Sequence, residues 1–103
     1  MSNVEDMHDM FYSCINFNSD LSRWDVSNVI DMSGMFYKCE KFTSDLGNWD
    51  VSNVENMGYM FYESNKFNSD LSDWDISKVE DMKGMFYGCR SMKKLPEWYV
   101  DHH

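Results

Sequence analysis

Apolar residues recur along this chain in a pattern that returns every 25 residues. The stretches WDVSNVIDMSGMFYKC, WDVSNVENMGYMFYES and WDISKVEDMKGMFYGC begin at Trp24, Trp49 and Trp74. The triplet MFY occurs four times, and valine, methionine, phenylalanine and leucine positions recur in step with it. Internal repeats with a period of roughly 20 to 50 residues are typical of proteins whose units bury their apolar faces against one another. The pattern therefore predicts a stack of about four coils of 25 residues each.

The beginning of each repeat predicts a very short strand. Trp24, Asp25 and Val26 alternate apolar, polar and apolar, and tryptophan and valine both favour strands. We expect the strand of one coil to pair in parallel with that of the next, at the usual spacing of about 4.8 Å.

The middle of each repeat predicts a short helix. Met32, Met35, Phe36 and Cys39 stand at the i, i+3, i+4 and i+7 spacing of an apolar helical stripe. Asp31 precedes them, where an N-cap residue accepts a hydrogen bond from the first turn. The fold class predicted is therefore α/β: a short solenoid in which each coil contains a very short parallel strand and a short helix.

We expect one repeat domain over residues 1–103. It is divided into a partial first coil, three full coils and a C-terminal cap: 1–23, 24–48, 49–73, 74–97 and 95–103. The first coil begins after the Trp and Asp positions, which predicts an uncapped N-terminal edge. Pro96 lacks an amide donor and Trp98 continues the tryptophan column one residue early, which favours a C-terminal cap. His102 and His103 are interpreted as tag remnants.

Charge and composition exclude several classes of partner. The chain carries 18 acidic and 9 basic residues, for a net charge of −9, which repels phosphate backbones and anionic membranes. No apolar run approaches the roughly 18 residues that span a bilayer, and the first residues show neither a basic n-region nor an apolar h-region. We expect no nucleic-acid partner and no membrane insertion.

The cysteines form one column of the repeat: Cys14, Cys39 and Cys89, with Ser64 in the fourth place. An odd number at spacings of 25 and 50 matches neither a disulfide framework nor a zinc motif. Replacement by serine indicates that the column needs a small, slightly polar side chain. We interpret these residues as buried free cysteines.

Conventional catalytic motifs are absent from the sequence, which has no P-loop, GxGxxG, HExxH or GxSxG pattern. His8 is the only histidine outside the tail, and its column also holds serine, glycine and lysine, so we expect it to be solvated. An active site needs dissimilar groups converging at one place, and repetition works against that. The sequence predicts neither an enzyme nor a metal or cofactor site.

Tyrosines form the most suggestive column: Tyr12, Tyr37, Tyr62 and Tyr87. One interpretation is an aromatic ladder between coils with the hydroxyl groups in water. The other is a contact stripe for a protein or glycan, because tyrosine favours surfaces that are apolar at one end and solvated at the other.

Three aspartate columns also recur. Asp6, Asp31 and Asp81 share a column with Asn56, which favours capping over metal binding, and Asp20, Asp45 and Asp70 lie in polar turns. Asp25, Asp50 and Asp75 are expected to point outward, and hydrogen bonds to the serines two residues later would offset their repulsion. A cation along this column and recognition of a basic partner remain alternatives.

The consensus WDVSNVxDMxxMFxxCxxFNxDLSxW resembles the repeat of BspA-like leucine-rich-repeat surface proteins, in particular the version found in mycoplasma surface lipoproteins. The resemblance extends from Val4 to about Trp98. It implies a leucine-rich-repeat-like solenoid in surface or secreted proteins, with roles in adhesion and host contact and no catalytic residues.

We therefore predict a non-enzymatic recognition or adhesion module that binds a protein or glycan through an outer face. Its candidate binding residues are the tyrosine column and the outward aspartates: Tyr12, Tyr37, Tyr62, Tyr87, Asp25, Asp50 and Asp75. The alternative function is a structural or self-associating spacer that stacks with further repeats through the N-terminal edge.

Overall fold

The computed structural model describes residues 4–100 and contains one helix in that range, α1 (Glu97–Val100). No extended strand or sheet forms among the described residues. Three isolated parallel bridges join Asp6 to Asp31, Asp31 to Asn56, and Asn56 to Asp81. The predicted α/β solenoid, with a strand and a helix in every coil, is therefore wrong.

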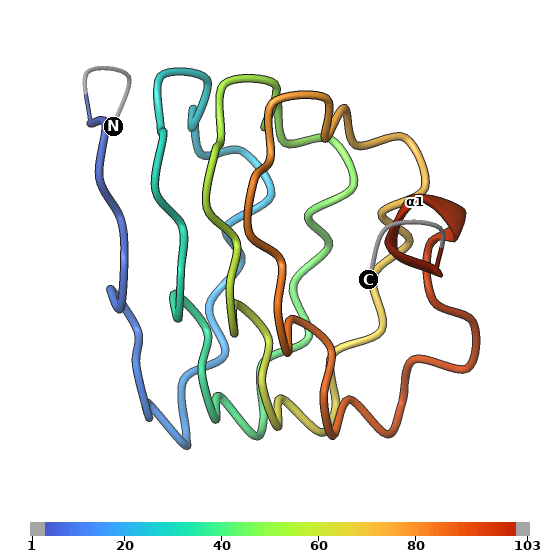
Figure 1. Cartoon of the computed structure of the whole chain (residues 1–103). Coiled ribbons are helices and arrows are strands. Elements are labelled where there is room, and N and C mark those ends of the chain that lie inside the picture. Colours follow the sequence, from blue (N-terminus) through green and yellow to red (C-terminus); the bar gives the residue numbers. More distant parts are fainter. Residues whose placement is uncertain (1–3, 101–103) are drawn as a thin grey trace.

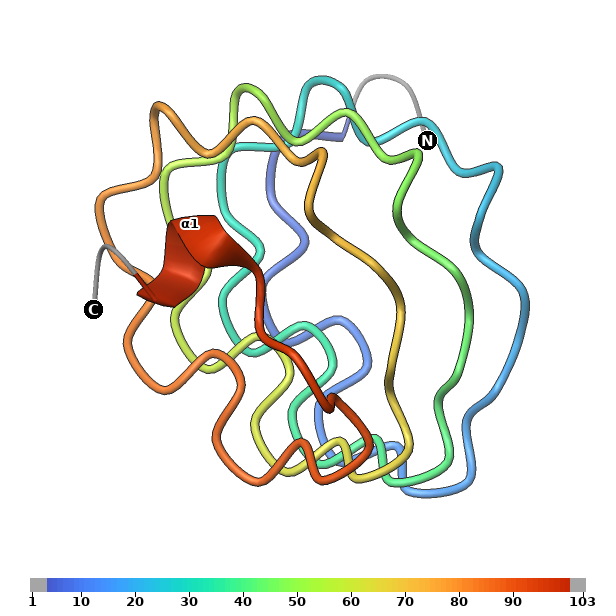
Figure 2. The same ribbon diagram turned by 90° about the vertical axis from the view of Figure 1, so that its right-hand side faces the viewer.

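The chain instead winds through successive circuits that are built of turns. We use the word circuit for one passage of the chain, one repeat long. Circuits that follow one another in the sequence also lie side by side in space, and α1 lies against the last of them (Figure 1). A second view shows the irregular outline that the circuits share (Figure 2). The repeat thus sets the path of the backbone without producing regular secondary structure.

Two consecutive turns replace the predicted helix. The amide of Met35 donates to the carbonyl of Met32 at 3.2 Å, and the amide of Cys39 donates to that of Phe36 at 3.1 Å. An α-helix would require bonds over four residues, whereas these close over three. Two such turns in succession place apolar side chains at the same i, i+3, i+4 and i+7 positions as a helix.

The conformation of each turn excludes a helix. Gly34 and Lys38, the third residues of the two turns, have φ values of +64° and +56°. Positive φ at this position is typical of type II turns, and α-helices need negative φ throughout. The amides of the same residues donate to the next circuit, Gly34 to the carbonyl of Gly58 at 2.9 Å and Lys38 to that of Tyr62 at 2.7 Å. The amides therefore bond between circuits rather than along one.

The predicted strand is likewise absent, and residues 24–26 only link two turns. The amide of Trp24 donates to the carbonyl of Leu21, and that of Val29 to Val26, both at 3.0 Å. Parallel pairing between neighbouring circuits does occur, but at the column of Asp31 instead of the tryptophan column.

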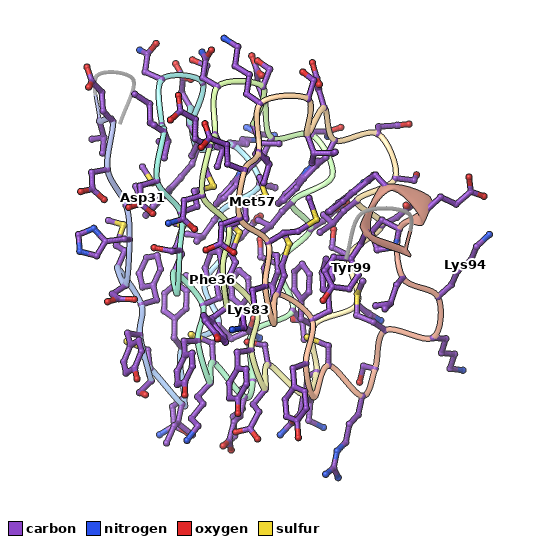
Figure 3. The ribbon with its side chains drawn as sticks, viewed as in Figure 1. Asp31, Phe36, Met57, Lys83, Lys94 and Tyr99 are labelled. Atoms are coloured by element: carbon purple, nitrogen blue, oxygen red, sulfur yellow. The ribbon has the colours of Figure 1, made fainter. Side chains whose placement is uncertain are left out.

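One apolar core runs through the stack, from Met7 in the first circuit to Tyr99 in α1. Phenylalanines of successive MFY triplets stack with ring centroids 5.6, 5.5 and 5.7 Å apart: Phe11, Phe36, Phe61 and Phe86. Figure 3 shows Phe36 inside the stack and Lys94 pointing away from it. The columns predicted to face inward therefore do form the core.

The cysteine column is buried from the second circuit onward, as its serine replacement indicated. Cys39 Sγ donates to the Phe11 carbonyl and Cys89 Sγ to the Phe61 carbonyl, both at 2.9 Å. Ser64 Oγ makes the equivalent bond to Phe36 at 2.5 Å. All three thiols are free, but Cys14 is exposed, so the predicted burial is wrong for that residue.

At the other end, Trp98 keeps its place in the tryptophan column. Its ring stacks on Trp74 with centroids 6.3 Å apart, and Tyr99 meets Phe86 edge-on at 4.9 Å. The division into coils and a cap stays a prediction, and His102 and His103 lie outside the described residues.

Candidate functional site

The tyrosine column forms a continuous ladder on the outside of the stack. Neighbouring rings have centroids 4.4, 4.7 and 5.1 Å apart and interplanar angles of 3°, 7° and 14°. Exposure is greatest at the two ends, 50% for Tyr12 and 62% for Tyr87. The structure thus brings all four predicted residues together and confirms the ladder between circuits.

Stacking decides which part of each ring a partner can reach. The faces of Tyr37 and Tyr62 lie against neighbouring rings, so their edges and hydroxyl ends are the accessible parts. Ring edges carry the positive side of the aromatic quadrupole. Lys38 Nζ lies 5.6 Å from the Tyr37 ring centroid and 3.9 Å from a carboxylate oxygen of Glu63. Burial, as the largest cause, raises the pKa of Tyr12, and the neighbouring Tyr37 adds to the shift.

The outward aspartates make the predicted bonds to the serines two residues later. Asp25 Oδ1 accepts from the amide and hydroxyl of Ser27 at 3.0 and 2.6 Å. Asp50 makes the same pair of bonds at the same distances. The serine side chain, followed by its amide, lowers the pKa of both carboxyl groups. These contacts hold the exposed aspartates in local turns.

The side chains in the column of Asp31 accept hydrogen bonds from amides in turns rather than at the ends of helices. Asp31 Oδ1 accepts from the Ser33 amide at 2.9 Å, and Asn56 Oδ1 accepts from Gly58 at the same distance. Asparagine therefore replaces aspartate without loss of the bond, as expected, although no helix follows.

Three residues at the start of this column have the side-chain types of a metal site. Ligand atoms of Asp6, His8 and Asp31 lie within 4.8 Å of one another. Asp6 Oδ1 already accepts from the His8 amide at 3.0 Å and meets His8 Nδ1 at 2.5 Å. The contact with Asp6 raises the pKa of His8, and the His8 amide, as the largest cause, lowers that of Asp6. His8 is exposed, as predicted, but has a carboxylate partner.

A hollow of about 380 Å³ lies beside the tyrosine ladder. It is lined by Tyr12, Tyr37 and Tyr62, by Tyr59 and Asp9, and by Ser33, Gly34 and Gly58. Tyr59 is 41% exposed, and its ring meets Tyr62 at 5.9 Å and 68°, close to perpendicular. A larger hollow, of about 680 Å³, lies against the last circuit beside Tyr99.

Sequence reasoning missed Tyr59 and Asp9 because their column varies. Asp9, Gly34, Tyr59 and Gly84 occupy equivalent positions and all have positive φ, between +56° and +65°. The two glycines in this column could have indicated the special backbone conformation, since glycine recurs where φ is positive, a conformation that most residues avoid. Each glycine is covered by the side chain of the preceding circuit, Gly34 by Asp9 and Gly84 by Tyr59.

The first circuit presents a different kind of surface. Met10 and Ile15 are 42% and 47% exposed, although other methionines of the repeat are buried. In later circuits the carbonyls of Met35 and Tyr37 accept amides from the circuit before. Among the described residues, no backbone amide donates to the equivalent carbonyls of the first circuit, at Met10 and Tyr12.

Comparison with known proteins places this repeat in a family. Residues 1–98 match the family described as "Mycoplasma protein of unknown function, DUF285", and the chain belongs to that family. No curated protein and no solved structure matches the chain. Within the described range, no helix has the length and apolar character needed to cross a membrane.

Proposed function

We propose that this domain is a non-enzymatic recognition module that binds a protein partner beside its tyrosine ladder. The observation that carries the proposal is the row of stacked rings, which presents a rigid, partly apolar surface with hydroxyl groups at its margin. Tyrosine supplies contact area at low entropic cost and is enriched in interfaces.

Protein is favoured over glycan as the ligand. Sugars bind aromatic side chains through CH contacts with ring faces, and the faces of Tyr37 and Tyr62 lie against neighbouring rings. A net charge of −9 favours a neutral or basic partner over an acidic one.

The family match also bears on this proposal. Members of DUF285 are linked to BspA-like repeat proteins of mycoplasmas, and we propose the same relation for this chain. Adhesion at the cell surface or after secretion would follow from it. The outward aspartates Asp25, Asp50 and Asp75 are proposed as a secondary, charged contact for a basic partner.

The proposal is tested by screening the immobilised domain against matrix proteins, secreted host proteins and glycans. A saturable protein ligand is expected, and the double variant Tyr37→Ala, Tyr62→Ala should weaken it at least about tenfold, because central aromatic contacts dominate interface energies. Glu55→Ala, an exposed substitution in a variable column, serves as the matched control. Unchanged binding by a folded double variant would remove the ladder from the site.

A second function is favoured by the first circuit. Its exposed Met10 and Ile15 and its unused carbonyls form a surface onto which another repeat unit could stack. We propose self-association, or stacking with further repeats, as the alternative role. Light scattering across a concentration series tests it: a dimer that is lost in Met10→Asp supports stacking, and a monomer at all concentrations rules out self-association.

A further inference from the structure

We propose that the hollow over Gly34 is a binding site for one aromatic ring that carries a hydrogen-bond donor. The guest is the phenol of a tyrosine or the indole of a tryptophan on a partner protein. This inference rests on the proposed recognition function and specifies what its surface accepts.

The repeat contains its own reference for how a ring fits at this place. Tyr59 projects from a left-handed residue, packs beside Tyr62 of its own circuit, and covers Gly84 of the next. A Cβ added at Gly84 would lie 2.7 Å from two ring carbons of Tyr59, so the ring fills the space that the glycine leaves. The surface beside the ladder therefore accepts a ring lying across it.

In the second circuit the equivalent residue is Gly34, which supplies no side chain of its own. Gly34 has the same backbone conformation as Tyr59, with φ of +64° against +57°, but it contributes no ring beside Tyr37. Tyr59 and Asp9 both line the resulting hollow, and the Asp9 carboxylate covers Gly34. Gly34 therefore leaves open, beside the Asp9 carboxylate, the position that the Tyr59 ring fills one circuit later.

The orientation of the ladder rings favours an aromatic ligand over a cation. The ladder rings are stacked on one another, so they turn their electropositive edges toward the hollow. An edge attracts the electron-rich face of another ring, which is the arrangement of Tyr62 and Tyr59, at 68°. Cations prefer exposed ring faces, as in aromatic cages, and the stacked rings offer few.

Asp9 specifies the polar end of the guest. Asp9 is exposed and lines the hollow, and its carboxylate over Gly34 can accept a hydrogen bond from a phenol hydroxyl or an indole N–H. Phenylalanine satisfies the ring but leaves the carboxylate without that bond. A carboxylate-bearing guest would meet Asp9 and the net charge of −9.

The test is a titration of the 15N-labelled chain with N-acetyl-L-tyrosinamide, followed by NMR. Saturable shifts are expected at the amides of Gly34 and Gly58, which form the floor of the hollow. N-acetyl-L-phenylalaninamide should bind about tenfold more weakly, since it lacks one hydrogen bond to a charged group. Choline should produce no saturable shift at these amides.

Variants assign the contacts. Asp9→Ala should abolish the difference between the tyrosine and phenylalanine probes, as a double-mutant cycle requires. Tyr59→Gly, which suits the positive φ, should weaken both probes by removing one wall. Glu55→Ala is the matched control, because Glu55 is exposed and does not line the hollow. Asp9→Gly, which also removes the acceptor and suits the positive φ of Asp9, serves if the alanine variant loses spectral dispersion.

Each outcome has a consequence. Absence of saturable shifts at Gly34 and Gly58, or tighter binding of choline, would overturn the proposed site. Equal binding of the two aromatic probes would overturn the role of Asp9. If a protein ligand still requires Tyr37 and Tyr62 while the probes do not bind, this inference fails and the recognition function stands.

Discussion

The indole Nε1 of Trp74 donates a 2.9 Å hydrogen bond to the carbonyl oxygen of Leu46, across the boundary between two circuits. Trp49 makes the same bond to Leu21, and Trp98 makes it to Leu71. The tryptophan column therefore links each circuit to the one before it through a polar contact inside the apolar core.

Trp74→Phe should destabilise the domain by about 1–3 kcal/mol, because the buried Leu46 carbonyl loses a donor while most of the apolar ring remains. Urea unfolding followed by circular dichroism measures the change in unfolding free energy. Trp24→Phe is the control, since Trp24 begins the column and no bond from its indole to an earlier circuit is seen in residues 4–100. Equal losses in both variants would show that ring volume, and not the hydrogen bond, sets the effect.

Cys39→Ser should be tolerated, with a loss below about 1 kcal/mol, because Ser64 performs the same contact one circuit later. Cys39→Ala removes the donor to the Phe11 carbonyl and leaves a small cavity, so it should cost more than serine. Thermal unfolding of the two variants ranks them. Greater stability of the alanine variant would contradict the assigned hydrogen bond.

Thiol reactivity should separate the cysteines at pH 8. Burial raises the pKa of Cys39 and of Cys89 to about 12, so neither forms an appreciable thiolate in the folded protein. Cys14 is exposed and should react first, giving one rapid equivalent with Ellman's reagent and two more after denaturation. Cys14→Ser should abolish the rapid phase. Three rapid equivalents under native conditions would show that the stack opens on that timescale.

Acid should weaken the Asp50 turn. The Ser52 hydroxyl and amide hold the pKa of Asp50 below its ordinary value of 3.8, so the folded state favours the carboxylate. A depressed folded pKa contributes stability that is present above the unfolded value and is lost as pH falls through the folded value. NMR titration should show a pKa below 3.8 that returns toward it in Ser52→Ala. A value unchanged by that substitution would remove the serine as the cause.

Comparison of repeats within the sequence predicted which columns are buried, and it did so well. The cysteine column accepts Ser64 because a buried side chain at this position needs only to be small and to donate one hydrogen bond to a phenylalanine carbonyl. Asp25 and Asp50 bond the serines two residues later because aspartate makes such turns locally, independent of the fold. The tyrosine ladder follows from equal spacing in every circuit.

Secondary structure was not predictable from the same columns. Two turns that close over three residues give the apolar spacing of a helix, and only the backbone distinguishes them. Gly34, Gly84 and Gly88 mark the positions of positive φ, but Lys38 and Tyr59 take the same conformation in other circuits. Hydrogen bonding between circuits stabilises these residues there, which no local pattern reveals.

The hollow was beyond sequence reasoning for a related reason. Asp9, Gly34, Tyr59 and Gly84 share a column, and such variation alone resembles an unconstrained surface position. The variation in this column is understood only when adjacent circuits are compared. A residue with a side chain in one circuit lies over a glycine at the equivalent position of the next circuit. The column alternates between a residue with a side chain and a glycine. A comparison that looks only for similar residues in each column does not detect such an alternation.

The bonds between circuits also determine how the domain responds to force. The amides of Gly34 and Lys38 bond to the following circuit, so one circuit cannot keep its shape after its neighbour has left. Tension between the two ends of the chain loads these contacts one boundary at a time. Under load the stack is therefore expected to extend by single repeats, releasing a loop of 25 residues at each step.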